Sequence, residues 1–244
     1  LSAFGITTRY VENNNWKEIE AAINEHTRLI FAETIGNPCL DVTDIKKLSQ
    51  IAHSHGIPLI VDNTTSTPYL IRVLEHGADI VVNSSSKYIN GSSNAISGVL
   101  TDSGKFKWDK EKYPGLADYV KFGPMAFVAK IRNGLFRNIG ACLAPVNAYL
   151  NLIGIETLGL RMERECGNAY ELAQWIEDTY PDIKVNYPGL KSSPWHDIAD
   201  GELTNGYGAI LTIRVGSKER AFSIINALTV PKIVSNIGDT KTLI

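Results

Sequence analysis

The stretch Ile80-Val81-Val82-Asn83-Ser84-Ser85-Ser86-Lys87-Tyr88 is the most informative part of this 244-residue chain. Its first residues have the composition of a short buried strand, and three hydroxyl side chains and a lysine follow at once. A second apolar run, from Ile57 to Val61, ends in Asp62. Polar side chains therefore follow two strands of the predicted fold.

Strand and helix patterns alternate along the first hundred residues. Short apolar runs predict strands over 5–11, 28–33, 59–62, 79–82 and 97–101. Apolar residues at helical spacing predict helices over 16–24, 44–55 and 69–76. Thr43 is the predicted N-cap of the second helix. Strands separated by helices are typical of βαβ units, which predicts a mostly parallel, buried sheet.

The second half of the chain predicts a smaller α/β unit. Apolar residues at helical spacing run from 146 to about 180. A strand–helix–strand group follows, with its elements over 183–186, 209–215, 220–228 and 232–235. We expect two domains joined by the long helix, with residues 1–158 belonging to the larger and residues 159–244 to the smaller.

The polar residues that follow the strands favour one kind of chemistry. Ligands of open α/β sheets bind beyond the carboxyl ends of the strands, where Asn37, Asp62, Ser84 and Ser86 are predicted to lie. Hydroxyls can hold a phosphate, a carboxylate can hold a protonated ring nitrogen, and Lys87 can form a Schiff base. Pyridoxal phosphate needs all three. Each residue also has a structural alternative, as a cap, a turn residue or part of a solvated loop.

Composition narrows the other possibilities. The formal charge of −2 gives no basic surface for nucleic acid, and no apolar stretch reaches the ~18 residues of a membrane span. The three cysteines, Cys39, Cys142 and Cys166, form no CxxC pair and no metal-binding pattern. We expect buried free thiols, a reducing cytoplasmic location and no metal.

Several ordered motifs resemble one family of enzymes. The chain is similar to the Cys/Met-metabolism family of pyridoxal phosphate enzymes in the segments 33–38, 61–64, 67–70, 77–82, 84–88, 97–99, 154–161 and 236–243. The resemblance implies the fold-type-I, aspartate-aminotransferase-like architecture: a mostly parallel sheet domain plus a smaller C-terminal α/β domain, here incomplete at both ends. It also implies a homo-oligomer, a dimer or homotetramer with shared sites.

The resemblance assigns a role to each candidate residue. It implies that Lys87 is the Schiff-base lysine, Asp62 the partner of the pyridinium nitrogen, Ser84 and Ser86 phosphate ligands, Asn37 a neighbour of the ring hydroxyl, and Asn236 a neighbour of the substrate carboxylate or of the lysine.

Two segments, 101–108 and 139–148, resemble the O-acetylhomoserine sulfhydrylase branch. This implies γ-replacement on O-acetylhomoserine with sulfide or a thiol, giving homocysteine or methionine and acetate. The alternatives are a cystathionine or methionine γ-lyase and a non-catalytic paralogue that keeps the fold. Asn83 and the run from Asn90 to Ser93 depart from the family pattern, which usually has histidines there, and these departures concern substrate preference.

Overall fold

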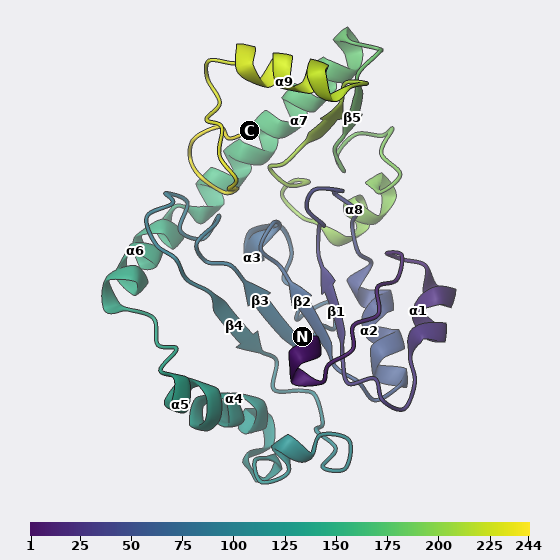
Figure 1. Cartoon of the computed structure of the whole chain (residues 1–244), viewed down its shortest axis with the longest axis vertical. Coiled ribbons are helices and arrows are strands. Elements are labelled where there is room, and N and C mark those ends of the chain that lie inside the picture. Colours follow the sequence, from purple (N-terminus) through teal and green to yellow (C-terminus); the bar gives the residue numbers. More distant parts are fainter.

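The main sheet has four strands in the spatial order β1, β2, β3, β4 in the computed structural model, which describes residues 1–244 (Figure 1). Their bounds are Ile30–Glu33, Leu59–Asp62, Ile80–Asn83 and Val99–Asp102. β1, β2 and β3 run parallel, and β4 pairs antiparallel with β3. The sheet is therefore mostly parallel, as the alternating pattern predicted.

The two central strands are the buried ones. Leu59 and Val61 of β2 are fully covered, and Ile80 of β3 is 1% exposed. On the outer strands, Phe31 of β1 is 57% exposed and Val99 of β4 is 45% exposed. The apolar runs therefore mark the middle of the sheet, where side chains are covered on both faces.

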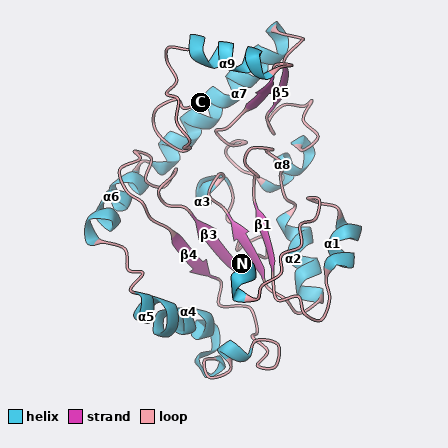
Figure 2. Cartoon of the chain, viewed as in Figure 1, coloured by secondary structure: helices cyan, strands magenta, loops and turns pink.

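Helices flank the sheet and connect it to a second, two-stranded antiparallel sheet of β5 (Lys184–Asn186) and β6 (Thr212–Arg214) (Figure 2). The α-helices are α1 (Trp16–Ala22), α2 (Ile45–Ser54), α3 (Thr67–Leu70), α4 (Ala126–Ile131), α5 (Arg137–Ile139), α6 (Pro145–Glu156), α7 (Leu158–Thr179), α8 (His196–Glu202) and α9 (Lys218–Ala227). None of them combines the length and apolar composition that crossing a bilayer requires.

The start of α2 differs by one residue from the prediction. The N-cap is Asp44, whose Oδ1 accepts a hydrogen bond from the Lys47 amide at 2.9 Å. Thr43 is not the cap, because its hydroxyl donates instead to the Glu33 carbonyl at 2.7 Å. Thr43 thus joins the segment before α2 to the end of β1.

Three predicted elements are wrong or partly wrong. Residues 5–11 form no strand, because this exposed segment pairs with no other strand. Residues 232–235 provide only an isolated bridge, between Lys232 and Leu243. The helix predicted over 69–76 ends at Leu70, and the chain then turns so that the Ala78 amide donates to the Val73 carbonyl at 3.1 Å.

The cysteines are free thiols, but only Cys166 is buried. The prediction that all three are buried is wrong. Cys39 lies in the exposed loop after β1, and Cys142 lies in the exposed segment between α5 and α6.

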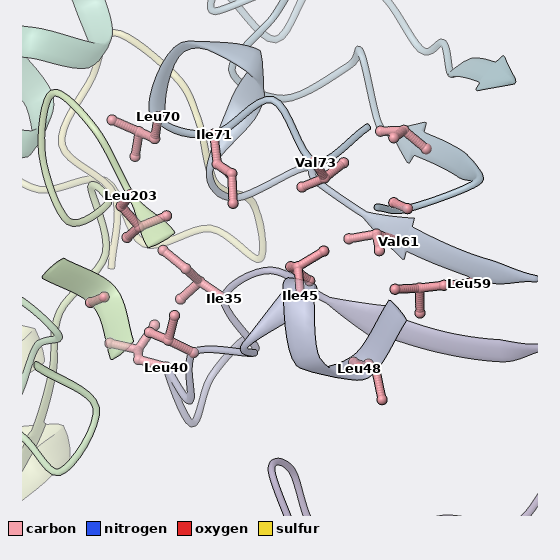
Figure 3. Packing of buried hydrophobic residues seen from close by; sticks show 14 of the residues in the cluster. Ile35, Leu40, Ile45, Leu48, Leu59, Val61, Leu70, Ile71, Val73 and Leu203 are labelled. Carbon is pink, nitrogen blue, oxygen red and sulfur yellow. The ribbon is translucent and has the colours of Figure 1, made fainter. Parts of the chain in front are cut away.

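The main hydrophobic core lies between the sheet, α2, α3 and α7 (Figure 3). Ile45 of α2 and Val61 of β2 are fully buried in it, and so is Met162 of α7. Leu203, which follows α8, packs in the same cluster. This core takes residues from both sides of Leu158, so the two-domain division at that residue stays a prediction.

We predict opposite effects for the same substitution in two neighbouring helices. A Cβ at Gly154 of α6 would lie 2.6 Å from the Ile89 carbonyl oxygen, whereas a Cβ at Gly167 of α7 would meet nothing within 4 Å. Gly154→Ala should lower the free energy of unfolding by about 1–3 kcal/mol. Gly167→Ala should raise it by about 0.5–1 kcal/mol through helix propensity. Urea unfolding measures both, and equal effects would contradict the close backbone approach at Gly154.

Candidate active site

The predicted site residues other than Asn236 follow the carboxyl ends of the parallel strands. Glu33 and Asp62 are register partners at the ends of β1 and β2. Val82 of β3 is the register partner of Asp62, and Ser84 follows two residues later. The parallel pairing thus places the end of each strand beside the next, as the sequence predicted.

Thr64 links Asp62 to the segment after β3. The amide and hydroxyl of Thr64 donate to Asp62 Oδ1 at 2.9 and 2.5 Å. The Ser84 amide donates in turn to Thr64 Oγ1 at 2.8 Å. Thr64 was not among the predicted site residues, although an aspartate two residues before a threonine is the spacing of an Asx-turn. It orients one carboxylate oxygen and leaves Asp62 Oδ2 without a hydrogen bond from the chain.

Lys87 meets a residue that lies 149 positions away in the sequence. The Lys87 ammonium donates to Asn236 Oδ1 at 2.5 Å, and Asn236 Nδ2 donates to Ser93 Oγ at 2.9 Å. The chain after α9 approaches the Lys87 loop closely, because a Cβ at Gly238 would lie 2.5 Å from the Tyr88 nitrogen. The lysine is therefore held by a segment from the far end of the chain.

The remaining candidates differ in how much hydrogen-bonding capacity they have left. Ser84 makes no side-chain hydrogen bond within the chain, and its hydroxyl is half-buried. Asn37 is exposed. Its backbone amide donates to Glu33 Oε2 at 3.2 Å, and its side-chain amide remains free to bind a ligand. Ser86 is committed to the Ser97 backbone, accepting from the amide at 2.7 Å and donating to the carbonyl at 3.0 Å. A phosphate role for Ser86 requires its hydroxyl to turn away from that carbonyl.

Two carboxyl groups, those of Glu165 and Asp239, have shifted pKa values. Burial raises the pKa of Glu165 on α7 to about 7, although Arg161 one turn earlier lowers it, and Asp239 raises it further. Burial also raises the pKa of Asp239, but hydrogen bonds from Ser93 and Lys241 outweigh burial and bring it to about 2. Asp239 therefore stays ionised, and its Oδ1 accepts from the Lys241 backbone amide at 2.9 Å and from the Lys241 ammonium at 3.1 Å.

The residues present fit pyridoxal phosphate. Three groups that follow adjacent strands have unused hydrogen-bonding capacity: Ser84 Oγ, Asp62 Oδ2 and the Asn37 side chain. Lys87 adds an amine a few residues after Ser84. These are an alcohol donor, an anionic acceptor, an amide and a nucleophilic amine, which match the chemistry of the cofactor. No group of three potential metal ligands lies together.

Two surface hollows lie elsewhere on the molecule. One, of about 450 Å³, has lysines and carboxylates from α2 and α8 in its wall. The other, of about 320 Å³, lies between the segments 104–108 and 120–126. Neither contains a predicted site residue, so the candidate site stays at the carboxyl edge.

The whole chain, residues 1–244, matches the family described as Cys/Met metabolism PLP-dependent enzyme. The chain belongs to this family. Similar proteins include a sulfhydrylase from Fusarium oxysporum f. sp. lycopersici, 42% identical over all of this chain and 59% of that protein. The homocysteine synthase of Schizosaccharomyces pombe is 39% identical over all of this chain and 60% of that protein. The chain thus spans about three fifths of the length of these relatives.

Solved structures of family members confirm the fold class. The O-acetylhomoserine sulfhydrylase of Wolinella succinogenes has a TM-score of 0.88 and 45% identity, covering 99% of this chain and 69% of that one. An O-acetylhomoserine (thiol)-lyase from Campylobacter jejuni has a TM-score of 0.92 and 31% identity, covering 99% and 63%. Its structure carries a pyridoxyl-lysine phosphate, which agrees with the cofactor expected from the sequence.

We predict that Glu165 makes stability depend on pH. Its pKa is about 7 in the folded chain against an ordinary value of 4.5, so between these values only the folded state keeps the proton. The free energy of unfolding of the wild type should therefore fall relative to that of Glu165→Gln as pH rises from 4.5 to 7. This difference, the gap between the two proteins, should level off above pH 7. Thermal unfolding across that range measures the gap. Glu163→Gln, an exposed position on the same helix, is the control, and a gap that shrinks with pH would contradict the burial of Glu165.

Proposed function

We propose that the protein carries pyridoxal phosphate on Lys87 and replaces the acetyl-bearing oxygen of O-acetylhomoserine with a sulfur nucleophile. Sulfide gives homocysteine, a small thiol such as methanethiol gives methionine, and acetate is released. The observation that carries the proposal is the position of the Lys87 amine. It is hydrogen-bonded to Asn236, and its loop follows the same carboxyl edge of the sheet at which Asp62 and Ser84 lie. Similarity to sulfhydrylases and homocysteine synthases supports the reaction type.

Asp62 and the serines hold the cofactor in this proposal. When bound, pyridoxal phosphate withdraws electrons from the amino-acid substrate and so makes its α and β protons removable. Asp62 keeps the ring nitrogen protonated, because an anionic partner strengthens that hydrogen bond. Ser84 and Ser86 bind the phosphate, and Asn37 lies near the ring hydroxyl.

Lys87 moves the protons in this proposal. Its amine takes a proton from the α carbon of the substrate and returns it at a neighbouring carbon, which requires the nitrogen to stay near both. Asn236 Oδ1 accepts from Lys87 Nζ and so fixes the direction in which the amine points. The Asn236 amide, which also donates to Ser93, lies close enough to this amine to bind the substrate carboxylate near it.

We further propose a homo-oligomer, a dimer or tetramer with shared sites, that acts in the cytoplasm. Exposed apolar side chains on α6, among them Val146 at 61% and Leu152 at 64%, support burial against another copy. The free cysteines support a reducing compartment. Residues 1–158 would belong to the cofactor-binding domain and residues 159–244 to the smaller one. The mass of the whole protein in solution tests the assembly, and an active monomer would contradict shared sites.

The substrate is tested by three parallel assays of the whole protein loaded with pyridoxal phosphate. We expect homocysteine from O-acetylhomoserine plus sulfide to form at least about tenfold faster than products from cystathionine or methionine, because a γ-replacement site must hold its intermediate against water until the thiol arrives. Rapid release of 2-oxobutanoate from methionine without homocysteine from the acetyl ester would identify a γ-lyase. No turnover of any of the three would support a non-catalytic paralogue.

A further inference from the structure

The segment that carries Lys87 folds into a short helical turn whose end lacks partners of its own. The Lys87 amide donates to the Ser84 carbonyl at 3.2 Å, and the Gly91 amide donates to the Lys87 carbonyl at 2.8 Å. Gly91 has a φ of 73°, a left-handed conformation that ends helical turns. The last carbonyls of such a turn accept no hydrogen bond from within the turn, so they need a donor from elsewhere.

Arg161, the fourth residue of α7, supplies that donor. Its Nη1 donates to the Tyr88 carbonyl at 2.6 Å, and its Nη2 donates to the Ile89 carbonyl at 3.3 Å. Nη2 also donates to the Gly154 carbonyl of α6 at 2.8 Å, and Nε donates to Thr157 Oγ1 at 3.2 Å. One planar guanidinium thus joins α6, α7 and the carbonyls of the two residues that follow Lys87.

This location is costly for a cation. Arg161 lies in the first turn of α7, where the helix dipole disfavours positive charge. Desolvation lowers the pKa of its guanidinium, and the Glu165 carboxyl one turn later raises it only in part. Its hydrogen bonds to carbonyls offset these costs. The loop also leaves space for it, because a Cβ at Gly91 would overlap the guanidinium.

The chain after α9 contacts the same turn at other peptide groups. Gly238 lies against the Tyr88 nitrogen, and the Thr240 amide donates to the Gly91 carbonyl at 3.0 Å. The turn after Lys87 is therefore held by contacts with both Arg161 and this segment. The segment also carries Asn236, which accepts from the Lys87 amine.

We propose that Arg161 is a positioning residue for Lys87: by holding the carbonyls of Tyr88 and Ile89, it fixes the direction of the lysine side chain toward Asn236. Arg161 acts through the backbone and touches neither cofactor nor substrate. The inference rests on the proposed function, in which the Lys87 amine must stay near the carbons between which it moves protons. A guanidinium suits this task because its donors diverge in a fixed plane, which a lysine ammonium cannot reproduce.

The test compares Arg161→Lys with Arg164→Lys, an exposed position one turn along the same helix, in the whole protein. With pyridoxal phosphate bound, Arg161→Lys should shift the pH midpoint of the visible lysine–cofactor band by about one unit, because the environment of the amine changes. It should lower kcat about ten- to hundredfold while KM changes less than about threefold. Arg164→Lys should change none of these quantities.

Hydrogen exchange gives a readout that needs neither cofactor nor turnover. In the cofactor-free protein, the amides of residues 88–91 should exchange about tenfold faster in Arg161→Lys than in wild type. If Arg161→Lys does not fold, Thr157→Val removes the Nε partner, together with the hydrogen bond from the Thr157 hydroxyl to the Gly154 carbonyl. It keeps the guanidinium donors to Tyr88 and Ile89 and should give smaller shifts of the same sign.

The outcomes separate this inference from the proposed function. A wild-type protein without a lysine–cofactor band would overturn the proposed function. A wild-type band with an unchanged midpoint and kcat in Arg161→Lys would overturn the positioning role alone, even if the melting temperature fell, because Arg161 would then only stabilise the fold.

Discussion

Because β1, β2 and β3 run parallel, their carboxyl ends share one edge, and the side chains after each strand are brought to it. Strand pairing brings Asp62 and Ser84 to that edge, and Thr64 ties them together. The sheet does not supply a hold on the Lys87 amine. That hold comes from the far end of the chain through Asn236.

Much of the fold follows from local pattern. β2 and α2 were predicted within one or two residues, because a buried strand and an amphipathic helix each leave a clear periodicity. The segment 5–11 has the β-branched and aromatic residues of a strand but no partner strand, and a strand exists only through pairing. α8 was not predicted because its seven residues are short of apolar periodicity, and it is fixed mainly by contacts such as the buried Leu203.

The site divides in the same way between local and distant signals. Lys87 and Asp62 could be recognised because their residue types and their positions after apolar runs are visible in the sequence. Gly238 and Arg161 could not be found from the residues alone, since their contacts with the Lys87 loop join segments more than 70 positions apart, and a glycine's close approach leaves no pattern. The hydroxyl of Ser86 illustrates the remaining limit: its residue type suits a phosphate, but the backbone of Ser97 occupies it.

The central claim is that Lys87 is the amine around which the site is built, and covalent trapping measures this directly. The whole protein is incubated with pyridoxal 5′-phosphate, reduced with borohydride, digested and analysed by mass spectrometry. The account predicts a pyridoxyl-phosphate modification at Lys87, because its amine is half-buried beside Asn236 at the carboxyl edge. Modification of another lysine, such as Lys105, with Lys87 unmodified would contradict it.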